Sequence, residues 1–268
     1  MQLAGVDFSC NPSRRKPITV ALGRVEGDSL RVAAIEEMTT LAAFDAWLAA
    51  PGTWLGAFDF PFGLPCEFVA ANGLGANCAE VIASVRTRCP TRMAWRAFID
   101  AWGNTRPKGQ RLLHRATDVD SESGVASTSP LQTRYVPVGL MYYEGVASLV
   151  RAGVTMPGLD AGDPQRIALE GYPRRLAHAL VGRRSYKNSE LPDRTEAREA
   201  IVAGLERADP NDNLVLGLDA ALRRSLVADA SGDRLDAVLC LVQAGIASRR
   251  EGYGLPAVVD PVEGWIVG

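Results

Sequence analysis

The order of strand-like runs in the first sixty residues restricts the fold of this chain more than any other feature of the sequence. Residues 3–9 form an almost uninterrupted apolar run, which is typical of a strand buried on both faces. Two runs rich in β-branched residues follow at 17–25 and 30–38, and the residues between them, 26–29 (EGDS), are typical of a hairpin turn. Three antiparallel strands are therefore predicted to open the domain.

A helix is predicted between the third strand and the fourth. Thr39 or Thr40 can cap the amphipathic residues 41–50, and Pro51 and Gly52 end that pattern. Residues 53–60 then form a fourth apolar run. Because a helical crossover joins strands that run in the same direction, the fourth strand is predicted to lie parallel to its neighbour.

The rest of the chain completes an α/β pattern. Residues 65–165 read as helices and loops and are interpreted as an insertion. A short fifth strand is predicted at 166–173, and it is followed by helices at 174–182, 198–206, 218–229 and 233–251 and an extended tail at 264–268. This order favours a ribonuclease H-like fold: one domain over residues 1–268, with a mixed five-stranded sheet flanked by helices and with its first and fourth strands as central neighbours.

Composition excludes several classes of protein. The chain has 268 residues, of which 47% are hydrophobic and 22% charged, as expected of one large globular domain. It has no apolar run of the roughly 18 residues that a membrane helix needs, and its first residues lack a signal-peptide pattern, so a cytoplasmic protein without membrane contact is expected. The five cysteines form no CxxC pair and there are only two histidines, which disfavours thiolate zinc sites and imidazole catalysis.

Two aspartates stand out because each is the only charge in an apolar strand. Asp7 lies in the first predicted strand and Asp59 in the fourth, and neither has a Lys or Arg within four residues. A buried carboxylate costs several kcal/mol unless it is paired, hydrogen-bonded or bound to a metal. Both residues are therefore candidates for a metal site.

The third acidic group is predicted in the last long helix. Asp233 and Asp236 are three residues apart and so share one helix face, with Asp236 closer to the apolar residues that follow. Asp233 can equally be read as a helix N-terminal acid that interacts with the helix dipole. Glu170, at the end of the fifth strand, is a weaker candidate, since Arg174 and Arg175 can pair with it at the surface.

Carboxylates of this kind favour magnesium or manganese. Two such ions about 4 Å apart can hold the attacking and leaving oxygens of a phosphodiester, with Asp7 as the bridging ligand. A metal-bound water supplies hydroxide near neutral pH without a histidine base. The sequence therefore predicts a metal-dependent nuclease whose catalytic residues are Asp7, Asp59, Asp236 and Glu170, and whose metal ligands are Asp7, Asp59, Asp233 and Asp236.

The chain also resembles a known family. The segments GVDFS, AFDFPFGLP, LEGYPRRL, GDRLDAVLCLVQA and DPVEGW are similar to motifs of an uncharacterised family, DUF429, whose members are predicted nucleases with the ribonuclease H fold. The resemblance covers about residues 3–267, and DFPFGLP and DRLDA are its most specific parts. It implies acidic site residues at Asp7, Asp59, Glu170 and Asp236. The late helix is also similar to that of RuvC-type junction resolvases, although those enzymes usually carry glutamate at the position of Asp59.

Basic residues offer candidate contacts to a DNA or RNA substrate. The segment 86–115 carries a charge of about plus seven in a chain of net charge minus two. It reads either as an anion-binding surface or as a solvated helix face and loop. The residues predicted to contact substrate are Ser9, Arg106, Lys108, Arg111 and Arg115. Arg14, Arg15 and Lys16, just after the first strand, can contact phosphate near Asp7 or form a solvated loop.

Two other functions compete with the nuclease. A non-catalytic nucleic-acid-binding module would keep the fold and lack the metal chemistry. A phosphotransferase of the actin and sugar-kinase type needs two copies of the core and glycine-rich turns that hold phosphate. Here Asp7 is followed by Phe-Ser-Cys-Asn-Pro, and the chain has room for one core. The phosphotransferase is therefore the least favoured.

Overall fold

An antiparallel β-meander forms one half of the central sheet. The computed structural model describes residues 1–119, 125–207 and 213–268. Strands β1 (Gln2–Asp7), β2 (Ile18–Glu26) and β3 (Ser29–Met38) pair in sequence order. Gly27, at a φ of 61°, makes the β2–β3 turn, as the hairpin chemistry predicted. The prediction of three opening antiparallel strands is confirmed.

Parallel strands form the other half of the sheet. Helix α1 (Leu41–Ala49) begins at Thr40, whose hydroxyl accepts a hydrogen bond from the Ala43 N–H at 3.1 Å. The chain then returns as β4 (Trp54–Phe58), parallel to β1, and β6 (Asp163–Glu170) lies parallel to β4. Strands β1 and β4 are central neighbours, as expected from the order of the elements, and they are parallel, as expected from the helical crossover.

Within the described residues the sheet has seven strands, so the prediction of five was too low. Its order is β5-β6-β4-β1-β2-β3-β7, an α/β arrangement with helices packed against both faces. The two additional strands are β5 (Val154–Thr155) and β7 (Val215–Gly217), one at each edge. At two and three residues, they are too short to give an alternating pattern, and their pairing with β6 and β3 defines them. Strand β5 and the first residues of β6 lie inside the segment interpreted as an insertion.

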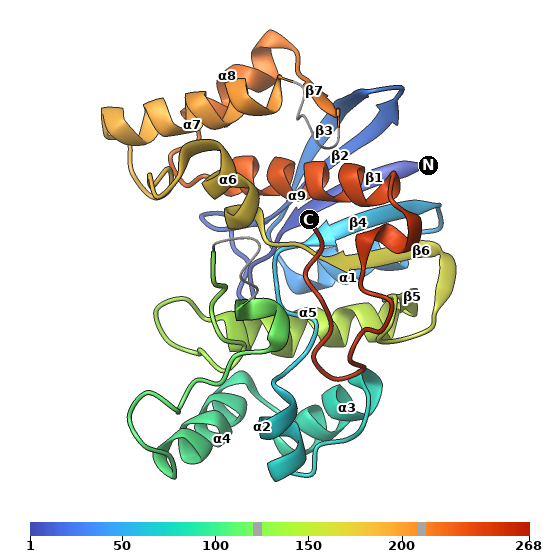
Figure 1. Cartoon of the computed structure of the whole chain (residues 1–268), viewed down its shortest axis with the longest axis vertical. Helices are drawn as coiled ribbons and strands as arrows, with labels where there is room; N and C mark the ends of the chain where they lie inside the picture. Colours follow the sequence, from blue (N-terminus) through green and yellow to red (C-terminus); the bar gives the residue numbers. More distant parts are fainter. Residues whose placement is uncertain (120–124, 208–212) are drawn as a thin grey trace.

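Helix α9 (Asp233–Ser248) covers one face of the sheet and lies directly over β1 (Figure 1). The contact is close because β1 has glycine at its centre: a Cβ on Gly5 would lie 2.0 Å from the Leu241 nitrogen and 2.1 Å from the Ala237 oxygen. The helices beside α9 on this face are α6 (Pro173–Val181), α7 (Pro192–Leu205) and α8 (Ala220–Ala228).

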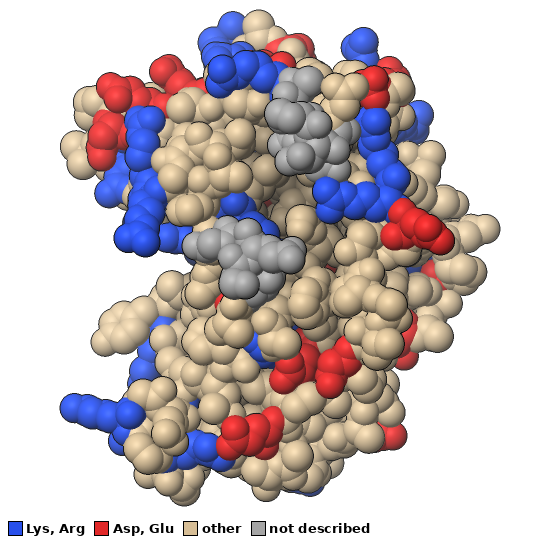
Figure 2. All heavy atoms as spheres, viewed as in Figure 1, with Lys and Arg blue, Asp and Glu red and all other residues tan. Residues whose placement is uncertain are grey.

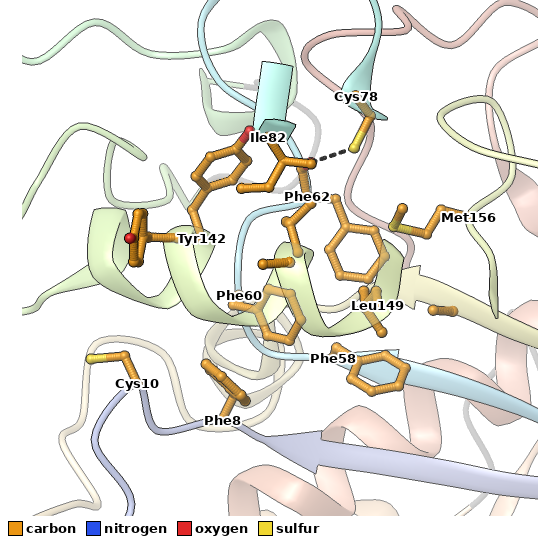
Figure 3. Close-up of a cluster of buried hydrophobic side chains, with 14 of the residues drawn as sticks. Phe8, Cys10, Phe58, Phe60, Phe62, Cys78, Ile82, Tyr142, Leu149 and Met156 are labelled. Atoms are coloured by element: carbon orange, nitrogen blue, oxygen red, sulfur yellow. Dashed lines mark hydrogen bonds between the residues drawn. The ribbon is translucent and has the colours of Figure 1, made fainter. Parts of the chain in front are cut away.

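A second core fills the opposite face, beneath α1 and α5 (Val138–Ala152). The phenylalanines of the DFPF motif supply much of it, because Phe58, Phe60 and Phe62 all point toward α5 (Figure 3). Their ring centroids are 5.9 Å apart for Phe58 and Phe60 and 5.2 Å for Phe60 and Phe62. Gly145 lets α5 approach, since a Cβ there would lie 2.6 Å from the Phe60 ring.

The remaining helices lie between β4 and β6 in the chain, within residues 65–165. They are α2 (Cys66–Ala71), α3 (Cys78–Arg88), α4 (Arg92–Asn104) and a 3₁₀ turn at Ala116–Val119. Residues 120–124 of the same segment lie outside the described residues. A second 3₁₀ turn, Glu251–Gly254, precedes the tail. Within the described parts of the chain, none of the helices is long and apolar enough to cross a membrane.

Candidate metal centre

Strands β1 and β4 present one aspartate each at the same edge of the sheet. In the parallel pairing Val6 is opposite Phe58, so the next residues, Asp7 and Asp59, lie side by side. The Asp59 N–H donates to the Val6 carbonyl at 2.9 Å and extends the ladder by one residue. Because Phe58 and Phe60 face α5, strand alternation turns Asp59 toward the α9 face. Asp7, two residues beyond Gly5, faces the same way.

Helix α9 brings the third aspartate. Asp236 lies in its first turn and is completely buried. The close contact at Gly5 holds this turn against the end of β1. Strands β1 and β4 run toward the side of the molecule on which α9 begins (Figure 1), so their carboxyl ends meet its N-terminal turn.

The three carboxylates form one cluster. Asp7, Asp59 and Asp236 each offer an oxygen, and these oxygens lie within 4.8 Å of one another. Asp7 and Asp236 are buried and Asp59 is half-buried. The prediction that these residues converge is confirmed. Three hard oxygen donors in a partly enclosed site match the ligand preference of magnesium and manganese.

Two neighbours of Asp236 were not found by sequence reasoning. The Tyr186 hydroxyl donates to Asp236 Oδ1 at 2.7 Å, and the Lys187 ammonium forms an ion pair with Asp236 Oδ2. Both lie in the loop between α6 and α7, which Arg198 holds by donating to the carbonyls of Tyr186 and Ser189. A search for cations close in sequence cannot find Lys187, since it is about fifty residues from Asp236. The only sequence signal was the pair Tyr-Lys in a polar loop.

Burial and charge crowding perturb the acids. Burial raises the pKa of Asp7 well above its usual range; Asp233 and Asp59 add to the rise, whereas Lys187 and Lys16 oppose it. Burial also raises the pKa of Asp59 to about 6, although Lys187 partly offsets the effect. The metal-free cluster therefore binds protons more readily than free aspartate does. A divalent cation would favour the same charged forms that burial disfavours.

Thr19 provides a further polar atom next to the cluster. It pairs with Asp7 across β1 and β2 and faces α9, like the Ala21 side chain two residues along. Thr19 is 1% exposed, and its hydroxyl has no hydrogen-bond partner among the described residues. Buried hydroxyls are normally paired, so an orphan beside three carboxylates fits a site that takes a ligand or ordered water.

Glu170 lies outside the cluster and belongs to a buried ion-pair network. Arg115 donates to both of its carboxylate oxygens, at 2.6 and 2.7 Å, and the Phe62 N–H donates at 2.9 Å. Arg115 also binds Asp118 at 2.8 Å, and the Glu263 carbonyl accepts from it at 2.9 Å. Glu170 contributes to the site only by electrostatics, since its charge adds to the rise in the pKa of Asp59.

This network also corrects the expectation for Arg115. A residue that binds substrate phosphate must reach the surface, and Arg115 is 1% exposed with its guanidinium occupied by two carboxylates. The side chain is structural: it ties the insertion to the end of β6. The sequence signal for substrate contact was positive charge alone, which cannot separate a buried structural arginine from an exposed one.

The other predicted site residues are not among the three converging acids. Asp233 begins α9, is half-buried, and acts on Asp7 through its charge, but it is not one of the three converging acids. Ser9 is buried just beyond β1. Arg106 pairs with Glu67 at 2.6 Å and stacks over Trp102. Lys108 and Arg111 are exposed.

Most of the basic segment is used for internal contacts. Arg86 and Arg92 both pair with Glu144, and Arg88 donates to the carbonyls of Asn72 and Gly73. Arg96 donates to the Thr133 carbonyl at 2.9 Å. These bonds hold the helices of the insertion together. The positive charge of residues 86–115 therefore arises largely from arginines with structural partners.

Comparisons with known proteins give no assignment. No family model matches the chain, and neither the curated proteins nor the solved structures contain a significant match. The family resemblance of the motifs therefore stays a prediction.

Proposed function

We propose that this protein is a metal-dependent nuclease that hydrolyses phosphodiester bonds of DNA or RNA, with a ribonuclease H-like fold of the kind found in the family it resembles. The observation that carries the proposal is the convergence of Asp7, Asp59 and Asp236, from two strands and one helix, on a point where their oxygens lie within 4.8 Å. Acids so far apart in sequence meet only through the fold. A cluster of partly buried carboxylates is unstable without a cation, which supports magnesium or manganese as cofactor.

The chain's own residues have distinct roles in this proposal. Asp7, Asp59 and Asp236 would form the donor set that holds the ions, with Asp7 as the expected shared ligand. Bound ions would supply a hydroxide nucleophile and stabilise the charge that develops on the phosphate. Tyr186 fixes the orientation of Asp236 through its 2.7 Å hydrogen bond. Lys187, released from Asp236, can reach the charged phosphate, because its side chain is one third exposed.

The charge around the cluster supports a polyanionic substrate. Lys187 and Lys16 are both close enough to lower the pKa of Asp7 and of Asp59. Lys and Arg side chains gather on the α6–α8 side of an indentation in the molecular surface, the side toward which β1 and β4 run (Figures 1 and 2). Acids at the centre with cations around them can hold metal and phosphate together. A cytoplasmic location is part of the proposal, in keeping with five free cysteines.

One observation favours a second candidate function. Lys187 already pairs with Asp236, so the cluster can be partly neutralised without a metal. A non-catalytic nucleic-acid-binding module would keep this ion pair as a structural feature. The two functions differ in whether the cluster binds a divalent cation.

The test compares the wild type with Asp7→Asn and with Asp193→Asn, a control that removes an exposed helix first-turn acid. Manganese should raise the melting temperature of the wild type and the control but not of Asp7→Asn, because only a state that binds the metal is stabilised by it. Without metal, Asp7→Asn should fold at least as well as the wild type, since it relieves crowding of carboxylates. Manganese-dependent cleavage of a labelled oligonucleotide should be lost in Asp7→Asn only. The proposal would be contradicted if manganese left the melting temperature of the wild type unchanged, or if Asp7→Asn did not fold.

A further inference from the structure

A pocket adjoins the carboxylate cluster on the side away from Asp59. It has a volume of about 510 Å³, within the range typical of small-ligand sites. Its floor is the sheet surface: Asp7 pairs with Thr19, and Thr19 pairs with Glu37, so the three side chains form a row across β1, β2 and β3. Neighbouring strands are about 4.8 Å apart, so the pocket begins about one strand from Asp7.

The walls of the pocket combine free positive charge with paired groups. Arg234 in α9 pairs with Glu37 at 2.7 Å, and Asp229 accepts from Ser231 and from the Arg234 N–H, so these charges are satisfied internally. Arg14 and Arg15 also line the pocket and are exposed. Neither guanidinium has an ion-pair partner among the residues that the structure describes. The pocket therefore presents two uncommitted cations.

Thr19 provides a second, independent observation at this pocket. It is one of the lining residues, and its buried hydroxyl has no hydrogen-bond partner in the described chain. A buried hydroxyl without a hydrogen-bond partner is unfavourable, and a ligand oxygen bonded to it would remove that penalty. Thr19 and the two arginines come from different strand and loop segments, and all three residues line the same pocket.

We propose that this pocket binds one unpaired nucleotide of the substrate, next to the phosphodiester at the cluster. Arg14 and Arg15 bind its phosphate, because guanidinium groups form bidentate bonds with phosphate oxygens. Thr19 and Asp233, whose carboxylate has no ion-pair partner among the described residues, lie on the side of the sugar and base. A nucleotide that is stacked and paired in a duplex cannot enter without leaving the stack, so the preferred substrate is a single strand or an unpaired end. This inference rests on the proposed function and names the substrate class of that site.

The test measures binding of adenosine 5′-monophosphate by calorimetry in buffer with EDTA, so that it does not depend on metal. The variants are the double change Arg14→Ala with Arg15→Ala, and Thr19→Val, which removes the hydroxyl at nearly constant volume. The control is Arg24→Ala with Arg31→Ala, which removes the same amount of positive charge. These two residues lie opposite each other in the strand register, at the other end of the β2–β3 hairpin.

The wild type should bind adenosine monophosphate more tightly than inorganic phosphate. The Arg14 and Arg15 variant should lose more than about tenfold in affinity and the control less than about twofold. Thr19→Val should lose about fivefold, while its unfolding midpoint stays unchanged or rises, because it removes an unpaired hydroxyl. A single-stranded oligonucleotide should displace the mononucleotide, and a blunt duplex of the same sequence should not.

Three results would overturn the inference: equal affinity of the Arg14 and Arg15 variant and the wild type, equal affinity for mononucleotide and inorganic phosphate, or equal displacement by the single strand and the duplex. Failure here is separable from failure of the proposed function. If only the pocket were misassigned, manganese would still stabilise the protein in a way that depends on Asp7. If the protein bound the nucleotide but did not respond to manganese, the pocket proposal would stand and the nuclease proposal would fail.

Discussion

At the scale of single residues, Lys187 supplies positive charge to the carboxylate cluster when no metal is bound. Its ammonium contacts Asp236 and lowers the pKa of both Asp7 and Asp59. The ammonium stabilises the same carboxylates that a divalent cation would bind. Lys187 and the metal ion should therefore compete for the cluster. Lys187 is part of the site in either role.

We expect Lys187→Met to destabilise the metal-free protein by roughly 1–3 kcal/mol, because it leaves Asp236 without its cation in a buried place. The same change should tighten manganese binding, since the competing ammonium is gone. Chemical denaturation and calorimetry measure the two effects, with Lys16→Met as a control that removes a cation from the same neighbourhood without breaking the Asp236 pair. Weaker manganese binding in Lys187→Met would instead show that the lysine helps to hold the metal-bound state.

The pKa of Asp59 gives the site a pH dependence. Its folded-state pKa of about 6 lies above the ordinary value of 3.8, so the folded protein binds this proton more tightly than the unfolded chain does. Between these two pH values the folded state holds more protons, and the contribution of Asp59 to stability falls as pH rises.

The unfolding free energy of Asp59→Asn should therefore increase relative to that of the wild type as pH rises from about 4 to about 6. Above about pH 6 the difference between the two unfolding free energies should stay constant. Two pKa units correspond to about 3 kcal/mol, an upper value for a half-buried side chain. The measurement is the unfolding free energy in EDTA at several pH values. A gap of the opposite sign would mean that Asp59 is stabilised as a carboxylate by partners other than a metal.

At the scale of secondary-structure elements, the site depends on how closely α9 approaches β1. The helix backbone rests on Gly5, and this contact places Asp236 against Asp7. The DFPF motif acts on the other face, where three phenylalanines packed against α5 fix which way β4 turns and so where Asp59 points.

Gly5→Ala should be strongly destabilising, by about 3 kcal/mol or more, because its Cβ would lie 2.0 Å from a backbone atom that cannot rotate away. Any Gly5→Ala protein that folds should bind manganese less tightly, because α9 must move away from β1 and carry Asp236 away from Asp7. Gly217→Ala in β7 is the matched control, where the nearest atom would be 3.3 Å away, and it should change stability by less than about 1 kcal/mol. Equal unfolding midpoints for the two variants would show that α9 does not need the glycine contact.

At the scale of the whole molecule, a buried network joins the insertion, the sheet and the C-terminal tail. Arg115 from the insertion binds Glu170 at the end of β6, and its neighbour Thr117 accepts a hydrogen bond from the Ile266 N–H at 3.0 Å. Glu263 of the tail accepts from the Cys66 and Ala116 N–H groups. The insertion is thereby fixed to the core through polar contacts as well as through its aromatic packing.

Arg115→Met should cost about 3–5 kcal/mol, because it leaves the buried carboxylates of Glu170 and Asp118 without a cation. The slope of log affinity against log salt for an oligonucleotide should not change, since Arg115 does not reach phosphate. Arg111→Met, an exposed change in the same segment, is the control for stability and should have little effect on it. If Arg115→Met flattened the slope of log affinity against log salt without lowering the unfolding free energy, Arg115 would have to contact the substrate after all.

The sequence by itself determined the parts of this protein that depend on local chemistry. Alternating and apolar runs defined the opening strands, the Thr40 cap and the parallel crossover, because these features depend on period and on a few turn or capping residues. The cost of burying a lone charge pointed to Asp7, Asp59 and Asp236, and these three do converge. Asp7 and Asp59 each lie in an otherwise apolar strand, and Asp236 lies where the apolar residues of its helix begin.

Only the tertiary structure decided which charges meet. The sequence offered Arg174 and Arg175 as partners for Glu170, yet Arg115, 55 residues away, donates to both of its carboxylate oxygens. Lys187 reaches Asp236 from another loop, and the row from Asp7 through Thr19 to Glu37 exists only because three strands pair in register. The physical reason is that a side chain's partners across the fold are set by packing and pairing over long sequence separations, whereas composition and spacing report only on neighbours along the chain.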